Sequence, residues 1–309
     1  MRVGGLDDLD LEAVVAPDGH AAAATYPPGS WLSLLEIPEG DMPKMEVVSA
    51  IKECLQCHAI GNAGTREIPA RYDDVSSREA WDHRTSGGAF GLMPSIYGRL
   101  GSQAQMFADW TDRIRAGEVP PQPPRPEGIE RNVVITMWDW ADPEAYLHDI
   151  ASTDRRNPTV NAYGPVYGAP ELSVDYIPVL DPMTNTAYRI PIAPRDPDTP
   201  RPSPDMLQPS PYWGDEVLWN SQMNVHNPMI DGEGRVWLTA RVRPSANPDV
   251  CREGSTHPSA VRFPNNSAGR HLAVWDPRAE QLTHVGTCFG THHLMFAEDE
   301  DNTLWTSGG

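Results

Sequence analysis

The chain has 309 residues, a formal net charge of −19 at pH 7 and 39% hydrophobic residues. This length allows two or three domains and a sizeable core. The negative charge disfavours nucleic acid and anionic membrane surfaces as partners, and no apolar run is long enough to cross a bilayer. The 32 prolines predict long ordered loops and linkers rather than an all-helical body.

The first residues alternate between apolar and polar side chains over positions 5–16, a pattern that predicts a short strand. We therefore expect residues 1–39 to be the tail of an upstream β domain and a linker. Residues 1–10 lack the basic start and apolar core of a signal peptide. We expect either that an export signal has been removed or that the chain is a fragment of a longer protein, and the end of the chain directly after a predicted strand, at residues 303–309, favours the fragment.

Residues 43–58 predict an amphipathic helix that ends in Cys54-Leu-Gln-Cys57-His58. Two thiols three residues apart lie on one helical face, so both can bond the vinyl groups of one porphyrin. The histidine that follows can then ligate the iron, which predicts covalently bound haem c. The cysteine pair could instead bind zinc, but the sequence has no second ligand pair at similar spacing. The pair could also act as a redox dithiol, but the sequence around it lacks the βαβ pattern of such proteins.

Two more helices are predicted before residue 118. Ser76 and Glu79 have the spacing of a capping box at the start of one helix. Residues 102–116 carry apolar side chains four apart and stop before Gly117, as a second helix would. Met106 lies on that apolar stripe and is expected in the core.

Three helices around a CxxCH pattern, with a Met-Pro loop before the last helix, resemble a small class I cytochrome c over residues 40–118. The resemblance implies that Met93 is the second axial iron ligand, opposite His58. A thioether ligand favours ferrous iron, which suits an electron carrier. Two alternatives stay open: Met93 as a core residue, and His83 as the ligand of a bis-histidine haem.

Residues 119–170 are expected to form a proline-rich linker and connecting strands. Residues 119–126 predict an extended polyproline spacer. Residues 132–140 are rich in β-branched and aromatic side chains, which favours a strand.

From residue 171 onward an uneven repeat is present. Residues 173–192 and 271–285 each read as strand, Asp-Pro turn and returning strand. Two further segments, 224–239 and 291–306, share a strand that begins at histidine, an acidic turn and a strand that ends in Trp-x-Thr. This pattern resembles the blades of β-propellers of the streptogramin lyase type. The pattern therefore predicts an incomplete propeller over residues 171–309, with at least two blades and a truncated chain.

The order of these parts resembles a family of bacterial secreted proteins. That family places a carboxypeptidase-regulatory-like β domain before a mono-haem cytochrome c segment and a lyase-like propeller. The predicted fold class is multidomain: a small all-α cytochrome c-like domain followed by an incomplete all-β propeller. The resemblance and the haem motif together imply a periplasmic or secreted protein.

Three histidines, His226, His292 and His293, fall where inner strands of the predicted propeller begin. The resemblance implies that such histidines, with acidic residues, bind a divalent metal such as Mg²⁺ or act as general bases. The alternative is that each histidine only caps or packs its own strand, and no acidic residue follows them at fixed spacing.

The two remaining cysteines, Cys251 and Cys288, are expected to form a disulfide in an oxidising compartment. The alternative is that both are free buried thiols.

The functional hypothesis is an exported c-type cytochrome that transfers one electron through its covalent haem. The propeller would bind a small-molecule substrate or a redox partner protein. The alternative is a lyase-like propeller enzyme or binding module, with the haem segment as an auxiliary or sensor domain.

Overall fold

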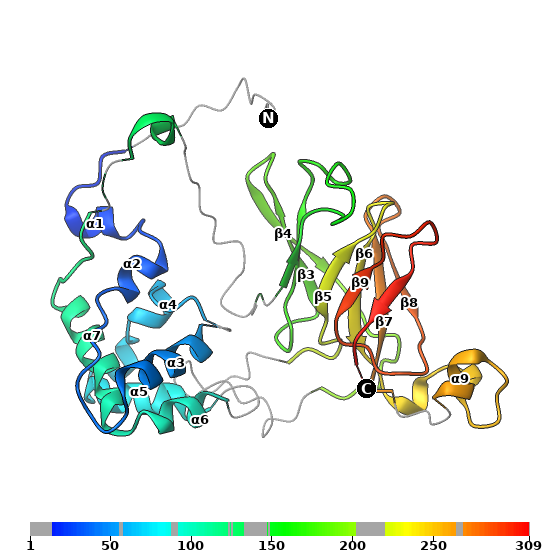
Figure 1. Ribbon diagram of the computed structural model, residues 1–309, viewed down its shortest axis with the longest axis horizontal. Coiled ribbons are helices and arrows are strands. Elements are labelled where there is room, and N and C mark those ends of the chain that lie inside the picture. Colours follow the sequence, from blue (N-terminus) through cyan, green and yellow to red (C-terminus); the bar gives the residue numbers. More distant parts are fainter. Residues whose placement is uncertain are drawn as a thin grey trace. The chain divides into compact units, whose positions relative to one another are not determined.

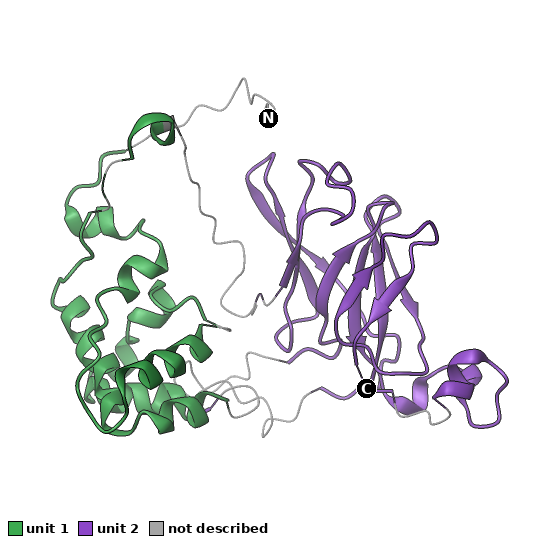
Figure 2. Cartoon of the chain, in the orientation of Figure 1, with its two compact units in different colours: residues 1–86, 92–133 green, residues 87–91, 134–309 purple. Residues whose placement is uncertain are grey.

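The computed structural model describes residues 14–55, 58–87, 92–122, 124, 126–132, 147, 149–201, 220–263 and 268–308. Most of the predicted strands over 5–16 and 132–140 lies outside these residues. The chain divides into two compact units, residues 1–86 with 92–133 and residues 134–309 with 87–91 (Figure 2). Each unit has its own hydrophobic core.

The first unit is built from short helices (Figure 1). The predicted N-cap at Ser76 is confirmed, because the Ser76 hydroxyl accepts the backbone N–H of Glu79 at 3.1 Å. Short 3-10 turns also occur in this unit, one of them directly before the last helix. The α-helices are α1 (Gly19–Ala23), α2 (Pro28–Leu32), α3 (Lys44–Cys54), α4 (Ala63–Arg66), α5 (Ser77–Thr85), α6 (Leu92–Arg99) and α7 (Gln105–Arg115).

Two tryptophans join the N-terminal helices to the core of this unit. Trp31 of α2 and Trp110 of α7 are 1% and 0% exposed. The indole N–H of Trp110 donates to the Trp31 carbonyl at 3.0 Å, and that of Trp31 donates to the Ala23 carbonyl at 3.2 Å. Buried indoles need such partners. The segment expected as the tail of a β domain therefore contains α1 and α2, which pack with α3 and α7.

A glycine permits the close approach of α2 to the turn after α3. Gly61 has φ +109°, and a Cβ there would come within 2.0 Å of the Pro28 carbonyl oxygen. Its N–H donates to the Thr65 hydroxyl at 2.8 Å, and its carbonyl accepts from Arg66 at 2.8 Å. Only glycine combines this backbone conformation with this contact.

The second unit consists mainly of antiparallel sheets. Its core is formed by side chains such as Ile177, Ile230 and Leu238, which are 0–1% exposed. One sheet has the order β1 (Asp149–Ala151), β2 (Val166–Ala169), β3 (Tyr176–Asp181) and β4 (Thr186–Pro191). The next has the order β5 (His226–Ile230), β6 (Val236–Arg241), β7 (Arg270–Asp276) and β8 (Gln281–Val285). A hairpin of β9 (Leu294–Phe296) and β10 (Leu304–Thr306) and the short helix α9 (Pro258–Arg262) complete the described elements.

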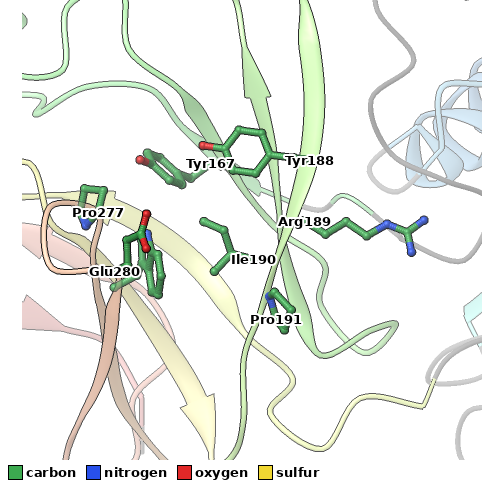
Figure 3. A pocket seen from close by; sticks show the side chains of 8 residues that line it. Tyr167, Tyr188, Arg189, Ile190, Pro191, Pro277 and Glu280 are labelled. Carbon is green, nitrogen blue, oxygen red and sulfur yellow. The ribbon is translucent and has the colours of Figure 1, made fainter.

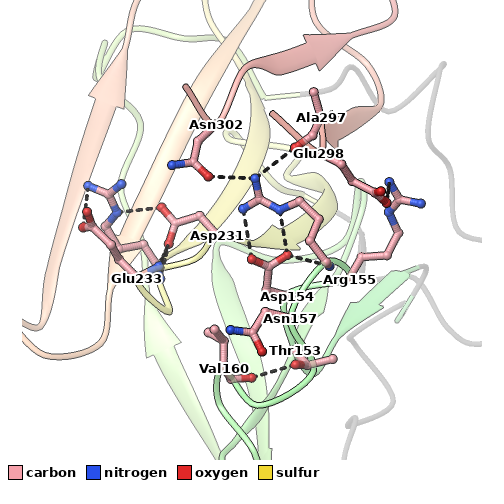
Figure 4. Close-up of polar contacts among 12 residues, drawn as sticks. Thr153, Asp154, Arg155, Asn157, Val160, Asp231, Glu233, Ala297, Glu298 and Asn302 are labelled. Atoms are coloured by element: carbon pink, nitrogen blue, oxygen red, sulfur yellow. Dashed lines mark hydrogen bonds and ion pairs between the residues drawn. The ribbon is translucent and has the colours of Figure 1, made fainter. Parts of the chain in front are cut away.

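The acidic turn of the repeated pattern has a clear structural cause. Asp231 closes the β5–β6 turn: one carboxylate oxygen accepts the N–H groups of Glu233 and Arg235, both at 2.9 Å (Figure 4). The other oxygen accepts the indole N–H of Trp237 at 2.8 Å. In the β9–β10 hairpin, Asp299 accepts the N–H of Thr303 at 2.9 Å. This bond spans four residues, as does the bond from the Arg235 N–H to Asp231 in the β5–β6 turn. The predicted hairpins are thus present as local structures.

An arginine links the loop after β1 to the β9–β10 hairpin (Figure 4). Arg156 donates to both carboxylate oxygens of Asp154, at 2.9 and 3.0 Å. It also donates to the Ala297 carbonyl at 3.0 Å and to the Asn302 side chain at 2.7 Å. The neighbouring Asp154 therefore balances the charge of this half-buried guanidinium, and two acceptors distant in the sequence fix its position on the hairpin.

The predicted fold class, an all-α cytochrome c-like domain followed by an incomplete propeller, is wrong. In the described residues the chain is mixed, with eight α-helices and ten strands. The helices have 4 to 11 residues, and no large helical cytochrome domain is formed. The antiparallel sheets do not close into a propeller. The repeated pattern encodes hairpins through turn chemistry, and hairpins alone do not specify how sheets are arranged.

A disulfide joins Cys251 and Cys288, which are 37 residues apart. Replacing both cysteines by serine should lower the free energy of unfolding of the second unit by roughly 3–4 kcal/mol, because the unfolded chain regains loop entropy. Thermal unfolding of the wild type and the double variant measures this difference. Equal stability, with the disulfide present in the wild type by non-reducing peptide mapping, would contradict the expectation.

A buried histidine pair predicts acid sensitivity. His271 is 0% exposed, and its Nε2 lies 3.0 Å from Nδ1 of His284, whose own Nε2 donates to the Ala193 carbonyl at 3.1 Å. Burial, together with the charge of Arg195, lowers the pKa of His271 from 6.5 to about 3. The unfolded chain therefore takes up this proton first as the pH falls. Stability from this group is complete above pH 6.5 and declines by up to about 1.4 kcal/mol per pH unit below it.

The measurement is the free energy of unfolding of the wild type and His271→Gln between pH 4 and 7.5. The stability advantage of the wild type should shrink as the pH falls below about 6.5, the ordinary pKa of histidine. If the difference in free energy of unfolding between the two proteins stays constant with pH, the pKa of His271 is the same in the folded and unfolded states, which would contradict the prediction.

Candidate functional site

The CxxCH pattern lies at the C-terminal end of α3. The helix ends at Cys54, and Leu55 is its C-cap. The backbone N–H of His58 donates to the carbonyl of Cys54 at 3.0 Å. Cys57 lies outside the described residues. The hydrogen bond spans four residues, as in an α-helical turn, so the first cysteine and the histidine of the pattern lie on one turn.

The environment of His58 favours a neutral ring. The side chain is half-buried, and burial, followed by the charge of Arg84, lowers its pKa below 6.5. Arg84 is held nearby, since its guanidinium donates to the carbonyls of Gly64 and Thr65. Neutral imidazole is the form that ligates metals in general.

Met93 is the second residue of α6, which packs against α3. An ion pair between Glu53 and Arg99 joins the last turns of these two helices. Met93 is half-buried. Met106, expected in the core, is 2% exposed and lies there. The rival ligand His83 is exposed on α5, with its ring 5.5 Å from that of Tyr72.

The three candidate histidines of the second unit lie together. His226 is the first residue of β5 and is buried, whereas His292 and His293 directly precede β9 and are exposed. One ligand nitrogen from each lies within 4.8 Å of the other two. Burial and the neighbouring His293 lower the pKa of His292, so its ring is neutral at pH 7.

Sequence reasoning missed two acidic partners of this cluster. The Nδ1 atom of His226 lies 3.2 Å from a carboxylate oxygen of Asp149 and 3.5 Å from one of Glu171. Asp149 begins β1, in the segment expected to be linker and connecting strands. No fixed spacing relates these residues to His226, so only the packing of β1 and β2 against β5 reveals them, with Asp149 on β1 and Glu171 just after β2.

A pocket of about 400 Å³ lies elsewhere in the second unit (Figure 3). Tyr167, Tyr188 and Trp275 are the aromatic residues of its lining, and Ile190 is also part of the lining. Burial raises the pKa of Tyr167, one of these aromatics, to about 12. Glu280 is the one carboxylate in the lining. A single carboxylate without a histidine or thiol offers little chemistry, so the histidine cluster and the CxxCH turn are the stronger sites.

Comparison of the chain with family models, curated proteins and solved structures finds no match. Among the helices of the described residues, none combines the length and apolar character needed to cross a membrane. The site geometry is therefore the basis for a functional proposal.

Proposed function

We propose that this protein transfers single electrons through a haem c bound covalently to Cys54 and Cys57, with His58 as an axial iron ligand. One observation supports the proposal: α3 ends at Cys54, the first residue of the CxxCH pattern, and the N–H of His58 donates to the Cys54 carbonyl with the spacing of one helical turn. In such a turn both thiols can reach one porphyrin while the histidine meets the iron. Bound haem would supply the one-electron chemistry by cycling between ferric and ferrous iron.

The residues around the pattern fit a haem. His58 has the neutral ring that iron ligation needs. Cys54 is half-buried and packs against the edge of the core. Leu55 and Leu92, which neighbour Cys54 and Met93 in sequence, are 44% and 50% exposed. A porphyrin held at this turn would cover apolar surface of this kind. The proposal needs the turn and an open face, and it does not depend on a class I cytochrome c fold.

The proposed partner is a redox protein or a small oxidisable or reducible molecule. A net charge of −19 favours partners with positive surface patches, because charge complementarity accelerates encounter. We also propose a periplasmic or secreted location, because haem c is attached outside the cytoplasm. The disulfide between Cys251 and Cys288 is of the kind that persists in oxidising compartments.

Expression of the full chain with haem maturation machinery tests covalent attachment. The wild type should show a sharp reduced α-band and retain its haem after acid–acetone extraction. The double variant Cys54→Ala/Cys57→Ala should lose the haem on extraction, because both thioether bonds are absent. His20→Ala, which replaces an exposed histidine of the same unit, should behave as the wild type. Absence of haem from the wild type, or covalent haem in the double variant, would refute the proposal.

The second axial ligand is tested in the same protein. With Met93 on the iron, the oxidised wild type should show a weak near-infrared band that Met93→Ala abolishes. That variant should also have a lower reduction potential, since a thioether favours ferrous iron. Met45→Ala is the matched control, because this methionine of α3 is 75% exposed. If His83→Ala changes the spectrum and Met93→Ala does not, the haem is bis-histidine and Met93 is not a ligand.

A further inference from the structure

We propose that His226, His292 and His293 bind a first-row divalent transition metal, such as Zn²⁺, with one coordination position open to solvent. The three side chains come from two places in the chain, the start of β5 and the residues before β9. One nitrogen from each lies within 4.8 Å of the others. This site belongs to the second unit and is independent of the proposed haem.

The backbone around the three histidines is held by hydrogen bonds. Thr239 is 0% exposed and lies opposite His226 in the β5–β6 ladder. Its hydroxyl oxygen lies 3.3 Å from the His226 carbonyl and 3.2 Å from the His292 carbonyl. Ser307 donates its N–H to the His293 carbonyl at 3.0 Å and accepts the His293 N–H at 3.2 Å through its hydroxyl. The ligand-bearing backbone is therefore organised before any metal binds.

The ring positions need only a small adjustment to bind one ion. A zinc ion with Zn–N bonds of about 2.0–2.1 Å places tetrahedral ligand nitrogens about 3.3 Å apart, so the donors must approach by up to roughly 1.5 Å. The His226 and His292 rings are stacked, with centroids 4.8 Å apart and an interplanar angle of 12°. Because His292 and His293 are exposed, their rings can turn toward the buried His226 without disturbing the core.

Two carboxylates support the buried ligand. Asp149 and Glu171 face Nδ1 of His226, so they favour the tautomer with hydrogen on Nδ1 and the lone pair on the buried Nε2. Asp149 is itself fixed, because the same oxygen accepts the N–H of Asn227 at 3.1 Å. Carboxylates bonded to ligating histidines in this way orient the ring and raise its basicity.

The local charges also favour a cation. Arg270, whose guanidinium donates to the Thr239 hydroxyl at 3.0 Å and the Asn224 carbonyl at 2.8 Å, contributes one positive charge. Asp149 and Glu171 contribute two negative charges near His226. The net charge of these three side chains is negative, so a divalent cation is attracted to the site.

The donor set selects the class of metal. Three imidazole nitrogens suit Zn²⁺ and its first-row neighbours, whereas Mg²⁺ and Ca²⁺ prefer oxygen ligands. Three protein ligands with a solvent-exposed side leave a position for water or an anionic oxygen atom of a ligand. The site therefore differs from the Mg²⁺ centre that the lyase resemblance implies.

The test is titration of the metal-free full chain with Zn²⁺ by calorimetry, with Co²⁺ as a spectroscopic probe. All proteins carry Cys54→Ser and Cys57→Ser, so that the two thiols of the CxxCH pattern do not bind the added metal. We expect one equivalent of Zn²⁺ in this background and a Co²⁺ spectrum without sulfur-to-metal charge transfer. His292→Ala and His293→Ala should each weaken binding by more than the roughly 10- to 100-fold that loss of an outer carboxylate costs.

Two further variants separate metal binding from folding. His257→Ala is the matched control, because this exposed histidine lies in the same unit at the start of α9, and it should bind Zn²⁺ as the parent does. Asp149→Asn keeps the acceptor for Asn227 and should weaken Zn²⁺ binding by roughly 10- to 100-fold. Circular dichroism checks that each variant is folded. Absence of Zn²⁺ binding by the parent, or equal affinity in folded His292→Ala, would overturn the proposal.

Discussion

The four hydrogen bonds that Asp231 accepts in the β5–β6 turn determine much of the second unit. Two come from backbone N–H groups, one from the Trp237 indole and one from Arg235, whose Nε lies 2.7 Å from the carboxylate. A 3%-exposed carboxylate is costly to bury unless it is satisfied in this way. The register set at the turn holds for the pairs Ile230–Val236 and Met229–Trp237, and a one-residue shift between Met229 and His226 then places Thr239 opposite His226. The buried hydroxyl of Thr239 then brings the carbonyls of His226 and His292 together.

The histidine cluster is therefore a consequence of hairpin register and of contacts between hairpins. The side chain of Asn227 accepts the N–H of Leu294 at 2.6 Å, which joins β5 to the start of β9. Arg156 connects the loop after β1 to the same hairpin. These contacts place Asp149, His226 and His292 within a few ångströms, although the chain separates them widely.

The helical unit follows a different principle. Its core depends on two buried tryptophans, Trp31 and Trp110, that anchor short helices through indole hydrogen bonds. Gly61 then lets the turn after α3 lie directly on α2. The end of α3 stays at the edge of this core, which leaves Cys54 and His58 half-buried. Since each unit has its own core, the two proposed sites can be tested separately.

Features governed by neighbours in the sequence were predicted well. The N-cap at Ser76, the core position of Met106 and the hairpins around Asp181 and Asp276 all depend on side chains a few residues apart. The prediction of a propeller was wrong, because turn chemistry specifies a hairpin but not how sheets pack. The prediction of a cytochrome-like domain was wrong too, since the helices have only 4 to 11 residues and form no large helical domain in the described residues. Helices α1 and α2 were also missed, since five-residue helices rely on tertiary contacts rather than on their own propensity.

By itself, the sequence determined the CxxCH pattern, the acidic turns and the strong negative charge. It also identified three histidines at or directly before the start of a strand. Only the tertiary structure decided that these histidines share one site and that Asp149 and Glu171 support it. The physical reason is that a metal site joins atoms through space: β1 meets β5, and Thr239 bridges His226 and His292, only after long-range packing has buried the core between them.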